Sequence, residues 1–287
     1  MRKKISESNI FPQFDLYSEY RKIEQLISEK QIIGTYNRFG RALNPCFSLE
    51  DYINDLCFLD WDLRGTFLSI PEMREGLGIS KESFSNESIT EGKLLDFVQY
   101  AANLNFRVAI TIDYHPQVYL ADKKYLNALL ANMKDLLERL NAAFSTDERS
   151  SEIFVVYNDE LSSVVASEHP EIQPSITEYK KIDNRGDLKR KGEILCTLFK
   201  KLESIEKRLN GSPYKQLCSD TTFLFDKVGA RHWVEEDKIA SKTFLEMEPK
   251  MLEEWYDKTF TMFLSCMVIS DYLDIHKDIK EIKRVSQ

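Results

Sequence analysis

The strongest constraint on the fold lies near the end of the chain. Between residues 252 and 273, mostly apolar side chains recur three or four positions apart, at Leu252, Trp255, Thr259, Met262, Cys266, Ile269 and Leu273. This spacing places them on one face of an α-helix. A second row widens that face beyond what one partner helix needs: Tyr256, Phe260, Phe263 and Met267. The pattern predicts a helix inside a bundle.

The segments before this helix extend the bundle. Apolar residues at helical spacing predict a helix over 188–209 that ends near Asn210 and Gly211, and another over 214–228 that ends at Gly229. The polar stretch 145–151 is the predicted domain boundary. We therefore expect a mainly α-helical protein, with a C-terminal bundle over 152–287 and a mostly helical N-terminal region over 1–145 that includes a few short strands.

Local signals give the N-terminal region its expected elements. Asp15 is a typical N-cap residue, and Ser48 with Asp51 suggests a capping box. The β-rich run Phe106–Ile112 predicts a strand. Ile153–Tyr157 fits either a short strand or the first turn of a helix, because short apolar runs do not distinguish the two.

Charge and cysteine usage narrow the class of protein. The 287 residues carry a net charge of −8, which argues against general attraction to nucleic acid or anionic membranes. The five cysteines are dispersed without a CxxC pair, which indicates buried thiols in a reducing compartment. With no signal-peptide pattern, membrane span, nucleotide loop or metal motif, the sequence predicts a cytoplasmic protein without metal or cofactor.

Arg231 and His232 follow a predicted helix end at Gly229. The carbonyl end of a helix favours a protonated histidine, and a guanidinium binds phosphate well. This pair suits acid–base cleavage of RNA, whose own 2′-hydroxyl supplies the nucleophile. The alternative, which the spacing alone favours, is that His232 caps the helix while Arg231 pairs with Glu235 or Glu236.

A basic region precedes the pair. Positive residues gather where the helix over 188–209 begins, at Arg185, Lys189, Arg190 and Lys191. Free backbone N–H groups at a helix start add to phosphate attraction, so these residues are candidates for binding nucleic acid. The alternative is a solvated helix face whose charge Glu203 and Glu206 balance further along.

Acidic residues near the predicted strand suggest a third chemistry. Asp60 and Asp62 flank Trp61, and Asp113 follows the run 106–112. Carboxylates at the end of a strand are the side chains that a metal-dependent nuclease would use. The lysine expected two residues after a carboxylate on a second strand is missing. We therefore rank this hypothesis below surface acids and structural turns.

Three segments of the second half carry a family resemblance: NRGDLKRKGEILCTLFKKLESIEKRL, DTTFLFDKVGARHW and MLEEWYDKTFTMFLSCMVISDYL. Over residues 158–273 the chain resembles the C-terminal helical domain of AbiJ-like bacterial abortive-infection proteins, related to the HEPN (higher eukaryotes and prokaryotes nucleotide-binding) superfamily. The resemblance implies a helical bundle, often dimeric, that in active members cleaves RNA without metal. The positions that carry over are Gly186, Asp187, Lys191, Arg231, His232, Trp255, Tyr256 and Asp257. Of these, the WYD residues are expected to pack, with Asp257 orienting a basic side chain.

Two hypotheses of function follow. The first is an anti-phage or toxin-type homodimer that binds RNA and cleaves it, with Arg231 on the phosphate and His232 as acid or base. Active HEPN ribonucleases usually separate these residue types by several positions, whereas here the two are adjacent. The second is a non-catalytic module that docks onto a defence ATPase or nuclease. The sequence leaves open whether the protein is an enzyme.

Overall fold

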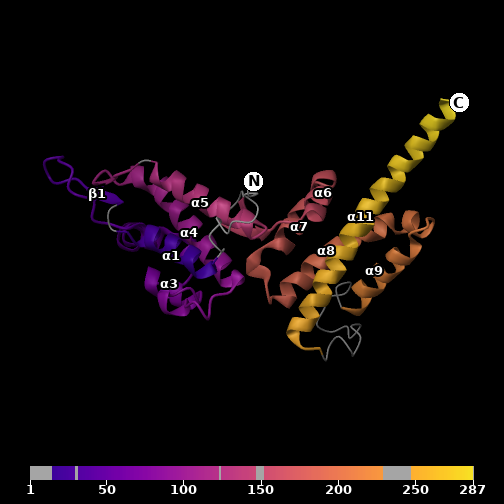
Figure 1. Ribbon diagram of the computed structural model, residues 1–287, viewed down its shortest axis with the longest axis horizontal. Coiled ribbons are helices and arrows are strands. Elements are labelled where there is room, and N and C mark those ends of the chain that lie inside the picture. Colours follow the sequence, from indigo (N-terminus) through magenta and orange to yellow (C-terminus); the bar gives the residue numbers. More distant parts are fainter. Residues whose placement is uncertain (1–14, 30–31, 123, 147–151, 229–246, 287) are drawn as a thin grey trace, which may run out of the picture. The chain divides into compact units, whose positions relative to one another are not determined.

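The computed structural model describes residues 15–29, 32–122, 124–146, 152–228 and 247–286 (Figure 1). Contacts divide the chain into two compact units, Met1–Val155 and Val156–Gln287. The prediction of a mainly α-helical fold with a few short strands is confirmed over the described ranges. No helix in these ranges is long and apolar enough to cross a membrane.

The first unit packs around a long central helix. Its described α-helices are α1 (Leu16–Ser28), α2 (Leu49–Tyr52), α3 (Ile70–Gly76), α4 (Glu91–Thr111) and α5 (Tyr125–Arg139). A π-helical turn over Ile53–Cys57 continues α2, and 3-10 turns span Phe58–Asp60, Asp62–Arg64, Lys81–Ser83 and Ile112–Tyr114. The predicted caps are present: the Asp15 side chain accepts from Ser18 N at 2.9 Å, and Ser48 and Asp51 form a capping box.

The predicted strand over 106–112 is wrong, because α4 continues through it to Thr111. Val108 is fully buried and lies four residues after the equally buried Leu104. Its side chain therefore continues the buried face of α4 at helical spacing. The strand preference of β-branched residues is weak and depends on context, so burial of this face decides the conformation.

Two small sheets belong to the described residues. Strand β1 (Ile33–Thr35) pairs antiparallel with β2 (Val118–Leu120), and β3 (Ala142–Thr146) pairs with β4 (Ile153–Tyr157). The segment that the sequence left open is thus a strand. Asn103 of α4 holds it, because its side chain donates to Ile153 O at 2.7 Å and accepts from Ile153 N at 2.8 Å. The first unit consequently extends to Val155.

The second unit is the predicted helical bundle. Its described helices are α6 (Glu160–Glu168), α7 (Gln173–Lys180), α8 (Leu188–Asn210), α9 (Lys215–Lys227) and α11 (Pro249–Val285), with a 3-10 turn over Ile182–Asn184. One hydrophobic core joins them, and Tyr179 stacks on Phe260 with ring centroids 4.1 Å apart. Helix α11 buries Tyr256, Phe260, Phe263 and Met267. This is the second row that its sequence marks.

Candidate functional site

A buried lysine joins three helices of the second unit. The Lys191 side chain is 7% exposed, and its Nζ lies 2.8 Å from Glu253 Oε1 and 2.9 Å from Asp257 Oδ1. The Tyr179 hydroxyl donates to Asp257 Oδ1 at 2.9 Å. We name these four residues the Lys191 cluster. It brings together Lys191 and Asp257, which the sequence analysis selected from separate segments, and adds two residues that it missed.

The local sequence explains how the cluster forms. Gly186 has a φ of +74°, a conformation that favours glycine, and its N–H donates to Glu253 Oε1 at 2.9 Å. The Asp187 side chain then caps α8 by accepting from Arg190 N at 2.8 Å. On α11, Glu253 and Asp257 lie four residues apart, so both carboxylates face the same lysine.

The charges of the cluster offset one another. Burial works to raise the pKa of Glu253, but hydrogen bonds from Lys191 and Gly186 outweigh it and hold that pKa below its ordinary value. Burial, reinforced by the Asp257 charge, raises the pKa of Tyr179 and keeps its hydroxyl a donor. One ammonium group therefore meets two carboxylates. A phosphate approaching Lys191 would encounter a net negative charge.

The other predicted RNA-binding residues are also engaged or dispersed. Arg190 Nη2 lies 3.1 Å from Glu178 Oε1, and Arg190 Nη1 lies 3.3 Å from Glu193 Oε2. Arg185 donates from Nε to Ile182 O at 3.2 Å, and Lys189 is exposed to solvent. Because Asp187 already occupies the start of α8, this end presents acids as well as bases. The geometry does not form a positive groove.

Of the remaining predicted site residues, two pack in or against the core and two lie outside the described residues. Tyr256 is buried in the core, and burial raises its pKa to about 12. Trp255 packs against the core from a half-buried position, with Lys258 Nζ 4.5 Å from its ring centroid. Both residues therefore pack, as the sequence predicts. Arg231 and His232 lie outside the described residues, so their catalytic role stays a prediction.

Helix α11 continues beyond the helices that it packs on. Arg208, in the last turn of α8, pairs with Asp274, so the residues after Asp274 project past the end of α8 (Figure 1). Around and beyond Asp274, four large apolar residues of α11 are spaced three and four apart. Tyr272, Ile275, Ile279 and Ile282, which we name the α11 stripe, are 47%, 56%, 40% and 64% exposed.

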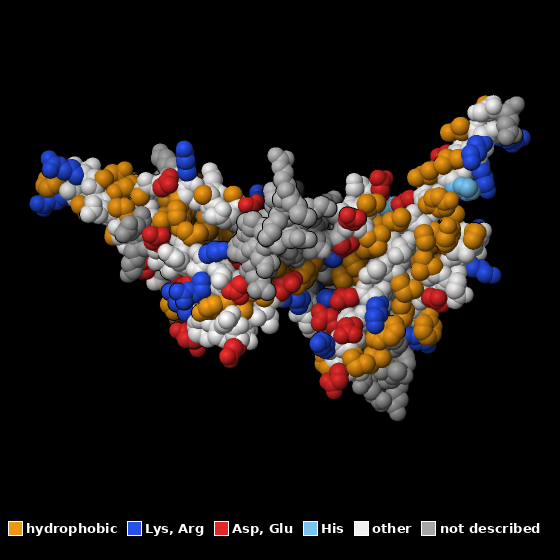
Figure 2. All heavy atoms as spheres, viewed as in Figure 1, with side chains coloured by type: hydrophobic (Ala, Val, Ile, Leu, Met, Phe, Trp, Pro, Cys, Tyr) orange, Lys and Arg blue, Asp and Glu red, His pale blue; other side chains and the backbone are white. Residues whose placement is uncertain are grey.

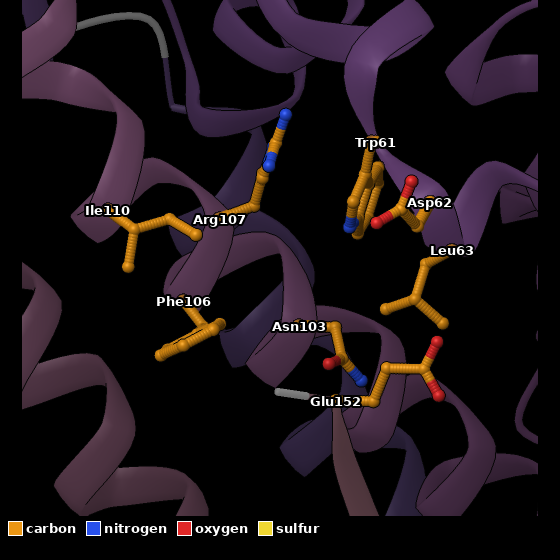
Figure 3. Close-up of a pocket in the computed structure, with 8 residues that line it drawn as sticks. All are labelled: Trp61, Asp62, Leu63, Asn103, Phe106, Arg107, Ile110 and Glu152. Atoms are coloured by element: carbon orange, nitrogen blue, oxygen red, sulfur yellow. The ribbon is translucent and has the colours of Figure 1, made fainter. Parts of the chain in front are cut away.

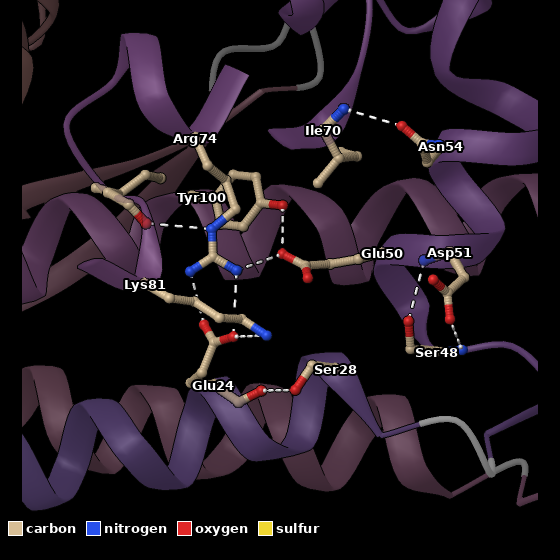
Figure 4. A network of polar contacts seen from close by, with 11 residues as sticks. Glu24, Ser28, Ser48, Glu50, Asp51, Asn54, Ile70, Arg74, Lys81 and Tyr100 are labelled. Atoms are coloured by element: carbon tan, nitrogen blue, oxygen red, sulfur yellow. Dashed lines mark hydrogen bonds and ion pairs between the residues drawn. The ribbon is translucent and has the colours of Figure 1, made fainter. Parts of the chain in front are cut away.

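The first unit contains a second buried ion network (Figure 4). Arg74 Nη2 lies 2.7 Å from Glu24 Oε2, and its Nη1 lies 2.8 Å from Glu50 Oε1. The Tyr100 hydroxyl donates to Glu50 Oε1 at 2.8 Å, and exposed Lys81 reaches Glu24 Oε1 at 3.0 Å. Burial raises the pKa of Glu50 against the opposing effect of Arg74. These five residues form the Arg74 network, which links α1, α2, α3 and α4.

Two cavities of the first unit offer less complete sites. One of about 590 Å³ lies beside the Arg74 network, lined by Glu50, Arg74 and Lys81 among others. The other, of about 60 Å³, lies between Trp61 and Arg107, and Arg107 donates from Nη2 to Asp60 O at 2.7 Å (Figure 3). In the wall of the larger cavity, Glu50, Arg74 and Lys81 are already engaged in ion pairs. The smaller one has room for little more than water.

The acids considered for a metal-dependent nuclease are dispersed. Asp60, Asp62 and Asp113 are exposed, and Asp113 lies in the 3-10 turn after α4 rather than at the end of a strand. Within the described ranges, no three or more His, Cys, Asp or Glu side chains are arranged to hold a metal ion. The helical course of residues 106–111 thus removes the structural premise of that hypothesis.

Comparisons with known proteins add no family. A scan against protein-family models, a search of curated proteins and a search of solved structures all found no match. The functional argument therefore rests on this chain's own residues. Of the features that the sequence analysis missed, the Glu253–Asp257 spacing and the three-and-four spacing of the α11 stripe were visible in the sequence, whereas the Arg74 network had no local signal.

Proposed function

We propose that the second unit is a protein-interaction module and that the α11 stripe is its contact surface. The observation that carries this proposal is the exposure of three isoleucines at helical spacing on a helix end that projects beyond its bundle. Large contiguous apolar surfaces are rare on monomeric proteins and mark interaction sites. Figure 2 shows apolar side chains among the charged ones at this projecting end of α11.

The charge distribution supports a protein partner over RNA. Lys191 and Arg190 are held by carboxylates of their own unit. Affinity for RNA depends on cations that are free to replace counterions along the phosphate backbone. At the start of α8, Arg190 joins this helix to α7 and Lys191 joins it to α11. The anti-phage ribonuclease, with Arg231 and His232 as its reacting groups, stays a prediction.

Photo-crosslinking in cells tests the proposed function. The full chain would carry benzoylphenylalanine in place of Ile279 or, as a matched control on another face of the same helix, in place of Lys280. We expect irradiation to yield one protein adduct of defined mass from position 279 and much less from position 280. An RNA adduct, or no protein adduct at position 279, would contradict the proposal.

Variants of the predicted catalytic pair test the rival hypothesis separately. Arg231→Ala and His232→Ala chains would be expressed beside the wild type, and growth and RNA integrity followed. We expect equal growth and intact RNA in all three cultures, because the proposed function needs neither side chain. RNA loss in the wild-type culture alone would replace the interaction module with a ribonuclease.

A further inference from the structure

We propose that the α11 stripe pairs with the α11 stripe of a second copy of this chain as a short parallel coiled coil. The inference rests on the proposed function and deepens it by naming the partner. Its starting observation is the spacing of exposed residues. Tyr272 and Ile279 are seven residues apart, and so are Ile275 and Ile282, which gives the alternating three-and-four pattern of a coiled-coil seam.

The bundle covers the face of α11 that bears the stripe only at earlier positions. At about 100° per residue, Ile275 and Ile279 lie about 120° around the helix from buried Phe263 and Met267, but within about 20° of Leu264 and Val268, which pack in the core. From residue 275 on, the side chains of the stripe are exposed. A second helix can therefore approach this part of the stripe without displacing the core.

Charged residues beside the stripe favour a second copy in parallel. In the heptad defined by Tyr272 and Ile275, Asp278 and Lys283 flank the seam on opposite sides, five residues apart. These are the positions that meet across a parallel pair, so Asp278 of each chain would face Lys283 of the partner subunit. An antiparallel pair would instead bring Asp278 close to acidic side chains of the other copy. Both residues are exposed to solvent.

The bundle already orders the end of α11. A short coiled-coil seam is therefore sufficient for two copies to pair. Isolated helices of this length are marginal in water because nucleation is unfavourable. Here the first 26 residues of α11, to Asp274, form part of the folded unit, so its last turns extend an existing helix. Pairing then orders few additional groups. The gain from covering four large apolar side chains per chain is opposed by a smaller entropic cost.

Sedimentation of the full chain over a range of concentrations tests the pairing. We expect a reversible monomer–dimer equilibrium that Ile279→Asp shifts to the monomer by at least 100-fold in dissociation constant, because each dimer would bury two unpaired carboxylates. Lys280→Asp, which lies off the seam, should leave the constant within about threefold. A wild-type chain that stays monomeric at every concentration overturns the inference.

Charge exchange tests the orientation. Asp278→Lys and Lys283→Asp should each weaken the dimer roughly tenfold, since each replaces two opposite-charge pairs by like charges. The double variant restores complementary pairs in a parallel dimer and should recover most of the affinity. Losses that simply add in the double variant would contradict the parallel arrangement.

Disulfide formation gives an independent readout of the same arrangement. Ser286 occupies a seam position at the end of α11, where two parallel chains place their Cα atoms about 6 Å apart, within reach of a disulfide. In a Cys46→Ser background, Ser286→Cys should oxidise to a covalent dimer, whereas Glu281→Cys on the outer face should not. An antiparallel pair centred on Ile279 would separate the two Ser286 positions by about 20 Å. No preferential crosslinking at position 286 therefore overturns the parallel model.

Failure of this inference is distinguishable from failure of the proposed function. A monomeric chain whose position 279 crosslinks to a different protein overturns the second copy as partner and leaves the interaction module in place. A monomeric chain with no protein adduct at that position overturns both.

Discussion

The two units contain similar buried ion clusters, but they differ in the apolar surface that lies near those clusters. Each holds a buried cation between two carboxylates, one of which also accepts from a tyrosine hydroxyl: Arg74 with Glu24, Glu50 and Tyr100, and Lys191 with Glu253, Asp257 and Tyr179. The first lies among helices α1 to α4 of its own unit. The second lies in a bundle whose longest helix projects with its apolar residues uncovered.

This difference indicates which surface of the molecule is available to bind a partner. In both, buried charges join helices, since a buried cation needs anionic partners. In the second unit, large apolar side chains at the end of α11 are exposed at helical spacing. We therefore assign the structural role to the ion clusters and the external role to the stripe.

The largest expected effect is on the Arg74 network. Arg74→Met should lower the free energy of opening of α4 amides by about 3–5 kcal/mol, because the largely buried Glu50 loses its cation and buried Glu24 keeps only the exposed Lys81. Native-state hydrogen exchange of α4 and α8 measures this, with exposed Arg21→Met as the control. An equal loss in α8 would show that the two units do not unfold separately.

Lys191→Met should have a smaller effect, in the other unit. We expect the opening free energy of α8 amides to fall by about 2 kcal/mol, because the Asp257 side chain is 54% exposed and water can solvate it once the lysine is gone. Lys189→Met, two residues away and exposed, is the matched control. A loss as large as that of Arg74→Met would erase the distinction between the clusters.

The pH dependence should separate the clusters by sign. The lowered pKa of Glu253 means that its stabilisation is present above the ordinary value of about 4.5 and lost as pH falls through the lowered pKa. The raised pKa of Glu50 means that its contribution is present at low pH and lost as pH rises through the raised pKa. Urea unfolding of wild type against Glu253→Gln and Glu50→Gln, at pH values on both sides of 4.5, should show opposite trends. Parallel trends would contradict these electrostatic environments.

The smallest expected effect is on the stability of the α11 stripe itself. Ile279→Asp should change the free energy of unfolding of the dilute chain by less than about 0.5 kcal/mol, because the side chain is exposed on the surface of α11. Thermal or urea unfolding at low concentration measures it. A loss of several kcal/mol would mean that the stripe belongs to the fold rather than to an interface.

The sequence predicts helices well where long amphipathic patterns repeat. The helices over 188–209, 214–228 and 252–273 are all present, since their periodicity extends over several turns. The error at 106–112 came from a local preference that burial of Val108 overrides. Sequence periodicity thus indicates which residues are buried, whereas local composition indicates only a conformational preference.

The candidate site was less predictable. The sequence marked Lys191 and Asp257, but only tertiary packing shows that each is the other's partner. The Arg74 network joins residues 24, 50, 74 and 100, which no local pattern connects. The spacing of the α11 stripe is visible in the sequence, but the stripe extends past Leu273, where the core pattern ends.

Amide hydrogen exchange at residues 275–285 of the full chain tests whether the α11 stripe pairs with a second copy. If the stripe pairs with a second copy, these amides should exchange slowly at high protein concentration and faster on dilution, while the same amides of Ile279→Asp exchange fast throughout. Exchange in the wild type that is fast and independent of concentration would contradict the pairing of the α11 stripe.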